Sequence, residues 1–242
     1  MNVVRPERSP SFLFLSIALV AGLFLLGQQL HRGIVEFKER DRVVTVKGLA
    51  EREVAADVAI WPLRFVDAGD DYSALYRTLE EKTARIVTFL REAGFADEDV
   101  TVSPPAVVDK LAQRYGSPGD VGLRYTASRT ITVYTGDVDR VRETMSRLEE
   151  LGREGIVFET DHHQARPQFL FTGLNDIKPA MIEEATLAAR EVARKFAEDS
   201  QSRVGRIRRA RQGQFTITDR DASTPHVKKV RVVSTIDYYL AD

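Results

Sequence analysis

The chain is 242 residues long, has a formal net charge of -1 and contains no cysteine. Hydrophobic residues make up 43% and charged residues 29%, a balance typical of a folded globular protein rather than a disordered or fibrous one. The near-neutral charge provides no general attraction to nucleic acid, so no nucleic-acid partner is expected. The lack of cysteine excludes disulfides, thiolate nucleophiles, zinc ribbons and an acylated lipoprotein cysteine.

The first predicted element is an N-terminal apolar segment. It follows a short tail, residues 1–10, and covers residues 11–30, which carry no charged side chain. As a helix rising 1.5 Å per residue it is roughly 30 Å long, enough to cross the hydrocarbon core of a membrane. A cleaved signal peptide and a buried core helix are the alternatives. No Ala-x-Ala-like pair of small residues follows the apolar stretch, which favours a transmembrane anchor or uncleaved signal.

Basic residues flank this segment on both sides. Arg5 and Arg8 precede it, and four basic residues follow it closely: Arg32, Lys38, Arg40 and Arg42. The positive-inside rule taken alone would place the folded domain in the cytoplasm. A short basic tail before an apolar run is also typical of a secretory signal, and long domains translocate largely regardless of charge.

Residues 31–42 predict a charged juxtamembrane linker, and the folded domain is expected over residues 43–242. Residues 43–48 and 57–66 are rich in β-branched and aromatic residues and predict two strands. In the second strand the apolar residues that share one face are Ala59, Trp61, Leu63 and Phe65. Pro62 cannot donate a backbone hydrogen bond, so we expect an edge strand or a bulge at this position.

Two amphipathic helices are predicted in the middle of the chain. The first follows Asp71, a plausible N-cap, and ends before Gly94. The second begins near Val138 and ends near Gly152, with apolar residues at helical spacing.

A third and longest helix is predicted from Asn175 or Asp176 to about Ser200. Its apolar face is expected to comprise Ile177, Met181, Ala185, Ala188, Val192 and Phe196.

The remaining segments predict strands and one turn-rich loop. The strand-like segments are residues 100–108, 123–133, 156–159, 168–172, 204–218 and 227–240, and the loop covers residues 115–122. The terminal strand should be central or buried between subunits, because its apolar sequence would promote aggregation at an open edge. Together the elements predict an α+β fold, in which a largely antiparallel sheet packs with three amphipathic helices after one N-terminal transmembrane helix.

Three stretches resemble the SIMPL-domain family: VTVKGLAEREVAADVAI, ATLAAREVARKFAEDSQSRVGRI and KKVRVVSTIDYYL. Gly48 and Asp57 match the family's opening segment, whereas Ala50 and Ala56 stand where a second glycine and a proline are usual. The resemblance covers roughly residues 43–240. It implies a mainly periplasmic α+β domain, a tendency to form homo-oligomers and a link of some members to oxidative-stress tolerance. It implies no established reaction and no catalytic residues.

The histidines offer one candidate for metal or proton-transfer chemistry. Asp161, His162 and His163 are consecutive, but neighbouring side chains on a strand point to opposite faces and cannot easily share one ion. An exposed turn is therefore favoured over the alternative of a metal-dependent hydrolase that uses His162 and His163. His31 and His226 have no metal-ligand spacing around them.

Other catalytic signatures are missing from the sequence. There is no G-x-S-x-G elbow to anchor a Ser-His-Asp arrangement. Gly116, Gly119 and Gly122 have neither dinucleotide-binding nor P-loop spacing. No catalytic, cofactor-binding or metal-binding residues are therefore assigned, and no cofactor is expected.

The densest basic run comprises Arg203, Arg206, Arg208, Arg209 and Arg211. On a regular strand Arg206 and Arg208 share one face and Arg209 and Arg211 the other, so the run would be divided. A solvated or intersubunit charged edge is favoured over an anionic-surface binder.

Trp61, Tyr238 and Tyr239 could form a ligand-stacking set, but the strand pattern assigns Trp61 to the core. Taken together, these features predict an inner-membrane, single-pass, non-enzymatic oligomeric scaffold or binding module of the cell envelope. Its C-terminal domain is expected in the periplasm, with the membrane and further copies of the chain as partners.

Overall fold

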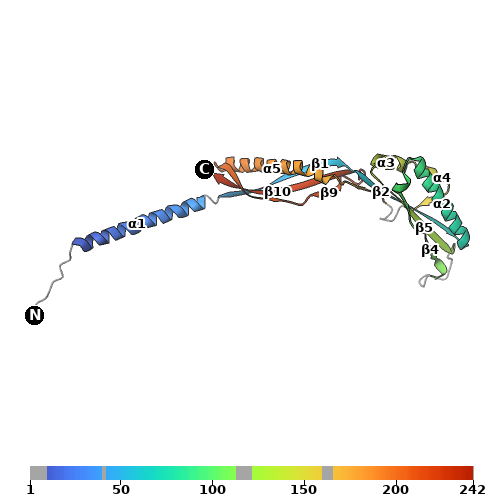
Figure 1. The fold of residues 1–242 in the computed structure, drawn as a ribbon, viewed down its shortest axis with the longest axis horizontal. Coiled ribbons are helices and arrows are strands. Elements are labelled where there is room, and N and C mark those ends of the chain that lie inside the picture. The colour runs from blue at the N-terminus through green and yellow to red at the C-terminus, as the bar shows by residue number, and fades with distance from the viewer. Residues whose placement is uncertain (1–9, 40–41, 113–121, 160–165, 242) are drawn as a thin grey trace, which may run out of the picture. The chain divides into compact units, whose positions relative to one another are not determined.

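The structure is a computed structural model that describes residues 10–39, 42–112, 122–159 and 166–241 (Figure 1). The chain divides into two compact units. Unit 1 comprises Met1–Ala50, Ile182–Gln214 and Val232–Asp242, and unit 2 comprises Glu51–Met181 and Phe215–Arg231. Helices accompany antiparallel sheets, so the predicted α+β class is confirmed.

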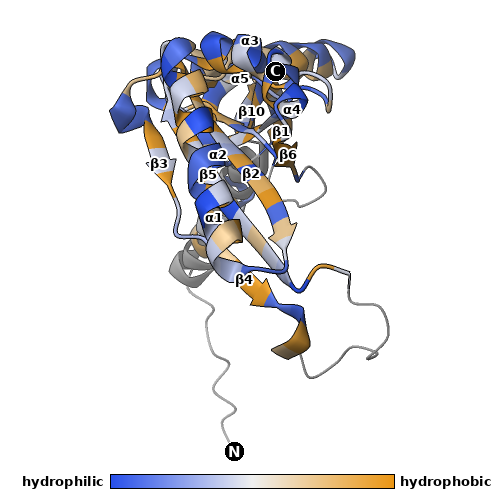
Figure 2. Cartoon of the chain, turned by 90° about the vertical axis from the view of Figure 1, so that its right-hand side faces the viewer, coloured by the Kyte–Doolittle hydropathy of each residue, from blue (hydrophilic) through white to orange (hydrophobic). Residues whose placement is uncertain are grey.

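Two long strands form the centre of the sheet in unit 2. β2 (Val58–Gly69) and β5 (Tyr125–Thr135) pair antiparallel over eleven residue pairs, from Ala59↔Thr135 to Gly69↔Tyr125. In Figure 2, β2 is coloured mostly as hydrophobic, with a few hydrophilic residues between. The predicted core face is confirmed, because Ala59, Trp61, Leu63 and Phe65 are all at most 2% exposed.

Four short strands extend this sheet. β3 (Val100–Val102) and β4 (Ala106–Asp109) pair with β5, while β6 (Val157–Phe158) and β7 (Gln168–Leu170) pair with β2. The single strand predicted over residues 100–108 is wrong. Pro104 and Pro105 lie between β3 and β4 and cannot donate to a ladder, which explains the interruption.

The expectation that Pro62 marks an edge strand is also wrong, because β2 has neighbours on both sides. Pro62 lies opposite Thr132 of β5 in an unshifted register. On the other side of β2, β7 pairs with residues 58–60 and β6 pairs with residues 65 and 66. The proline therefore falls in the interval between two short partner strands.

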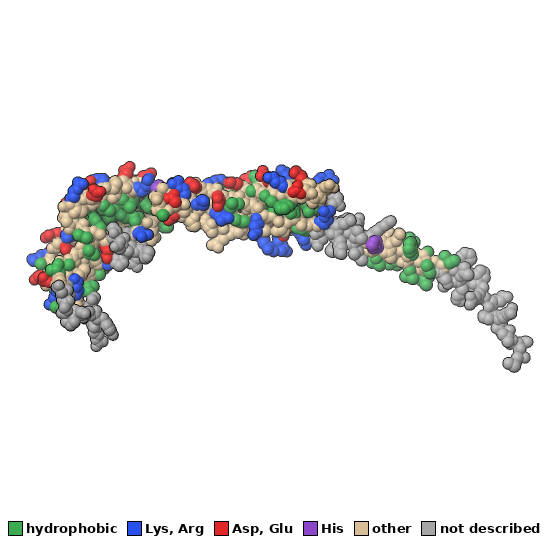
Figure 3. All heavy atoms as spheres, turned by 180° about the vertical axis from the view of Figure 1, so that it is seen from behind, with side chains coloured by type: hydrophobic (Ala, Val, Ile, Leu, Met, Phe, Trp, Pro, Cys, Tyr) green, Lys and Arg blue, Asp and Glu red, His purple; other side chains and the backbone are tan. Residues whose placement is uncertain are grey.

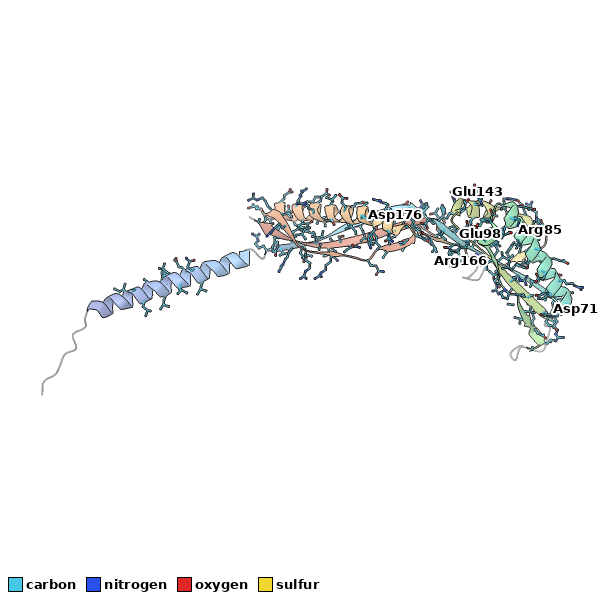
Figure 4. The ribbon with its side chains drawn as sticks, in the orientation of Figure 1. Asp71, Arg85, Glu98, Glu143, Arg166 and Asp176 are labelled. Atoms are coloured by element: carbon cyan, nitrogen blue, oxygen red, sulfur yellow. The ribbon has the colours of Figure 1, made fainter. Side chains whose placement is uncertain are left out.

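α2 (Tyr72–Glu92) confirms the first predicted helix. Its N-cap is Asp71, whose carboxylate accepts a hydrogen bond of 2.7 Å from the backbone N–H of Ala74, and Figure 4 labels Asp71 at this end. Its buried face enters the core of unit 2 with Leu79, Ile86, Phe89 and Leu90, each 0% exposed.

The second predicted helix is divided into α3 (Val138–Ser146) and α4 (Glu149–Arg153), so the predicted number of helices is wrong. Two i→i+3 bonds close the last turn of α3, from Arg147 N–H to the Thr144 carbonyl and from Leu148 N–H to the Met145 carbonyl. This tightening ends the α-helix before the next turn begins. One-turn 3-10 helices η1 (Asp97–Asp99) and η2 (Lys110–Ala112) complete the unit.

The second sheet contains β1 (Val43–Ala55), β10 (Val227–Ala241) and β8 (Arg203–Gln212) in the order β1-β10-β8, with β9 (Thr216–Asp219) also paired to β10. β10 is central, as predicted for the terminal strand. The strand predicted over residues 204–218 is divided into β8 and β9. At this interruption the Gly213 N–H donates to the Val233 carbonyl at 2.8 Å.

α5 (Leu174–Asp199) confirms the third helix, but its buried face differs from the predicted one. The buried residues lie four apart, at Met181, Ala185, Ala189, Ala193 and Ala197, each at most 2% exposed. Val192 and Phe196 are instead 37% and 55% exposed. Contact with β1 explains this difference, because the backbone of α5 lies directly over Gly48. A β-carbon built on Gly48 would lie 1.9 Å from the Ala185 carbonyl oxygen and 2.4 Å from the Ala189 nitrogen. Only the strip of alanines permits so close an approach of helix and strand.

Asp57 connects the turn between β1 and β2 to the residues just before α5. Its carboxylate accepts hydrogen bonds from the backbone N–H groups of Thr172 at 2.8 Å and Gly173 at 3.0 Å. The Thr172 hydroxyl donates a third bond of 3.0 Å. These bonds satisfy backbone donors at a helix entrance, as an N-cap does, but from a distant part of the sequence.

α1 (Pro10–Glu39) includes the uncharged residues 11–30. The large apolar side chains described between Ile17 and Leu30 are each 58–66% exposed. Among the described residues, no helix has both the length and the apolar character needed to cross a membrane.

Candidate functional site

The predicted basic run lies on β8, whose pairing with β10 is irregular. Arg211 and Arg209 lie opposite Thr235 and Asp237, but Ile207 lies opposite Tyr238. One residue of β8, Arg208, is therefore inserted without an opposite residue on β10, as in a β-bulge. A second shift of register occurs between Tyr238 and Leu240.

The bulge changes the face on which Arg208 lies. Its guanidinium carbon is 5.8 Å from the ring centroid of Tyr239. Tyr239 lies two residues after Asp237 and so faces the same side of β10. Arg209 also faces that side, because directly opposite residues in an antiparallel pair share a face. The predicted separation of Arg208 from Arg209 and Arg211 is therefore wrong.

We call this surface the arginine face and define it by Arg208, Arg209, Arg211, Asp237 and Tyr239. The three arginines are exposed. Asp237 is already engaged, because it accepts a hydrogen bond of 2.8 Å from the Thr45 hydroxyl of β1.

Basic side chains project from this part of the molecule in Figure 3. Exposed Lys47 lies two residues after Thr45 on β1 and adds a fourth cation to the same side of the sheet. The arginine face thus combines an excess of positive charge with an aromatic ring. Such a surface is suited to contact with anions, with a strength that falls as salt increases.

The histidine candidates do not join this surface. His162 and His163 lie outside the described residues. In the part of the chain that the structure describes, no group of three or more His, Asp or Glu side chains is arranged to hold a metal ion. His226 belongs to unit 2, where its ring meets Phe169 edge to face at 6.1 Å, and burial lowers the pKa of this imidazole.

Two of the three aromatic candidates, Trp61 and Tyr238, are packing residues, whereas Tyr239 lies on the arginine face. Trp61 is 2% exposed and belongs to the core of unit 2, which confirms its predicted role. Tyr238 is also 2% exposed and packs in unit 1 with Val46, Ala189 and Ile236.

Arg129 is a buried charge outside the set of residues predicted from the sequence. Its side chain is 6% exposed and donates hydrogen bonds to the Thr83 hydroxyl at 2.9 Å and to the Glu80 carboxylate at 2.8 Å. The bond from Arg129 lowers the pKa of Glu80. The alternation of β5 contained the signal, since Arg129 occupies the inward position between Ala127 and Ile131.

The fold and this surface define an α+β domain with two antiparallel sheets and an exposed basic sheet face. The family model for SIMPL, described as a protein of unknown function (DUF541), matches residues 44–235. The chain therefore belongs to the SIMPL family, as the three resembling stretches predicted. Comparison with the curated proteins found no match.

Proposed function

We propose that the protein is a non-enzymatic scaffold or binding module of the cell envelope, anchored in the inner membrane by residues 11–30 with its folded domain in the periplasm. The observation that carries the proposal is the uncharged segment within α1, whose described apolar side chains are 58–66% exposed. A helix that is apolar on all sides needs an apolar environment, which a bilayer provides. Family membership supports the periplasmic location and a role in stress tolerance.

Membrane fractionation and a topology reporter test the anchor. The full-length chain should remain with membranes after carbonate extraction, and a C-terminal alkaline phosphatase fusion should be active. Replacing both Leu19 and Leu23 with Lys should release the chain, because a charged side chain at the centre of a membrane helix opposes insertion. Activity of a cytoplasmic reporter at the C-terminus would contradict the periplasmic orientation.

Self-association of the domain is part of the same proposal. Leu187 and Phe196 on α5 are each 55% exposed, and burying such side chains between copies would remove apolar surface from water. Light scattering of the detergent-solubilised chain should give a mass above that of one chain. Phe196→Glu should lower that mass, whereas Leu111→Glu, at a 63% exposed position in unit 2, should not. A strict monomer across a wide concentration range would exclude self-association.

The arginine face supports a second candidate, an anionic-surface binder, because the bulge places Arg208 on the side of Arg209 and Arg211. Heparin-affinity chromatography of the full-length chain in neutral detergent tests it. Replacing these three arginines with Glu should lower the salt concentration at elution. The control replaces Arg77, Arg142 and Arg153 with Glu and changes the net charge equally. If both variants elute at equally lowered salt concentrations, binding depends on net charge and the arginine face has no specific role.

A further inference from the structure

A pocket of about 300 Å³ lies in unit 1 between the C-terminal half of α5 and the start of β8. Its lining residues are Arg190, Arg194, Ala197, Glu198, Ser202, Arg203 and Val204. Three guanidinium groups thus surround the pocket together with a single carboxylate. The volume is at the lower end of the range for small-molecule sites, so it suits a small charged group.

Two of the three arginines are close together and have no partner in the described part of the chain. Arg190 and Arg194 are four residues apart on α5, so their side chains project from one face of the helix and their charges repel. Among the described residues, neither has a hydrogen bond or ion pair with a protein group. Attraction to the helix dipole does not account for the pair, since the last turn of α5 contains no basic residue and the dipole acts only there.

The end of α5 holds the pocket wall in place. The Ser202 N–H donates to the Ala197 carbonyl at 2.8 Å, across Gln201, which adopts a left-handed φ of 55°. The Ser202 side chain is buried, and its oxygen accepts a hydrogen bond of 3.2 Å from Arg42, the residue just before β1. Hydrogen bonds with Ala197 of α5 and with Arg42 therefore fix Ser202 in the pocket wall. The wall needs little reorganisation to receive a ligand.

A buried phenol lies near the same arginines. Tyr238 is 2% exposed, and its hydroxyl oxygen has no hydrogen-bond partner among the described residues. Burial raises the pKa of this phenol, while the positive charges of Arg190 and Arg194 act in the opposite direction. Both guanidinium groups are thus within electrostatic range of a polar group that has no partner of its own in the described structure.

We propose that this pocket binds a phosphate group, held by the guanidinium groups of Arg190, Arg194 and Arg203. A planar guanidinium donates two parallel hydrogen bonds to phosphate oxygens, and an anion between Arg190 and Arg194 would relieve their repulsion. The phosphate is carried either by a lipid headgroup or by a soluble compound.

The lipid source rests on the proposed membrane anchor. Arg42 contacts Ser202 of the pocket wall and lies only twelve residues after Leu30, where the uncharged segment ends. Residues 31–39 continue α1 and rise about 14 Å at 1.5 Å per residue, so the chain keeps Arg42 near the membrane surface if residues 11–30 cross it.

The test uses the full-length chain in uncharged detergent, titrated with inorganic phosphate against sodium chloride of equal ionic strength. Phosphate should raise the melting temperature of the wild type. The double variant Arg190→Gln/Arg194→Gln should bind phosphate at least tenfold more weakly, while Arg77→Gln/Arg153→Gln should match the wild type. Arg190→Lys/Arg194→Lys, which retains the charge and serves if the Gln variant is unstable, should show intermediate binding because lysine cannot form the paired bonds.

Nanodiscs of phosphatidylglycerol and of phosphatidylcholine distinguish the sources. A stabilisation by phosphatidylglycerol that requires Arg190 and Arg194 identifies a lipid headgroup, whereas an effect of inorganic phosphate alone identifies a soluble compound. Either result supports the phosphate site. If neither probe acts in a way that depends on these arginines, the proposal is wrong. If the anchor proposal alone is wrong, carbonate will release the chain from membranes while the chain still binds phosphate.

Discussion

Gly48 and Asp57, the two residues that match the opening segment of the family, both have a packing role in this structure. Gly48 allows the backbones of β1 and α5 to meet, and Asp57 supplies hydrogen bonds to the entrance of α5. These contacts explain the two residue types by geometry alone. These two residues of the opening segment therefore help to position α5.

Replacing Gly48 with Ala should destabilise unit 1. The added β-carbon would lie 1.9 Å from a backbone oxygen of α5, and backbone atoms cannot rotate away as a flexible side chain can. We expect a loss of about 1–3 kcal/mol, typical of overpacking. Thermal unfolding of the full-length chain in detergent measures it. Gly152→Ala is the matched control, because a β-carbon added there would meet no atom of another element within 4 Å and alanine favours the helix α4.

The ion pair between Arg129 and Glu80 should make stability depend on pH. The pKa of Glu80 is lowered from its ordinary value of 4.5 by the hydrogen bond from Arg129. A carboxyl with a depressed folded-state pKa adds stability above its unfolded pKa and loses it as the pH falls through the folded value. Glu80→Gln should therefore lower the melting temperature at pH 7, and the difference from the wild type should shrink below pH 4.5. If the difference in melting temperature between the wild type and Glu80→Gln stays constant with pH, the charge of Glu80 does not contribute to stability.

At the scale of elements, the sequence predicts the regular strands and helices and fails where pairing is irregular. Alternation located β2 and β5, because one face of each is buried. The bulge at Arg208 could not be predicted, since it depends on the register with β10. Consequently the arginines were identified from the sequence, but their common face was not. The burial of Arg129 is not predicted, because a charge does not fit an apolar alternation.

The buried face of α5 illustrates the same limit. Alanines occupy two neighbouring strips of the helix, so hydrophobic spacing alone cannot decide which strip is inside. The close approach of Gly48 decides it in favour of Ala189 and Ala193, which leaves Val192 and Phe196 exposed. The rotation of the helix thus depends on a residue of another element.

This rotation predicts opposite effects of two substitutions on α5. Ala193→Leu should destabilise the chain by about 1–3 kcal/mol, because the added carbons enter a position that is 0% exposed. Phe196→Ala should leave the stability of the monomer within about 0.5 kcal/mol, because this side chain is 55% exposed. Urea unfolding at low protein concentration measures both. A larger loss of stability from Phe196→Ala than from Ala193→Leu would indicate that the helix face predicted from the sequence is the buried one.

At the scale of the whole molecule, β10 is the central strand of its sheet. It pairs with β8 and β9 and lies between β1 and β8 in the sheet order. Ile236 and Tyr238 of this strand also belong to the core of unit 1. By contrast, the core cluster of unit 2, among the described residues, consists of residues from elements other than β10. The strand therefore links the stability of unit 1 to the last residues of the chain.

Deletion of residues 230–242 should consequently unfold unit 1 while the core of unit 2 survives. Without β10, the strands β1 and β8 lose their shared neighbour, and their exposed backbone groups should promote aggregation. Limited proteolysis followed by mass spectrometry should show rapid cleavage within residues 182–214 and a protected fragment within residues 51–181. Removal of residues 241 and 242 alone serves as the control and should leave the wild-type pattern. Equal protection of both regions in the longer deletion would mean that β1 and β8 are stable without the strand between them.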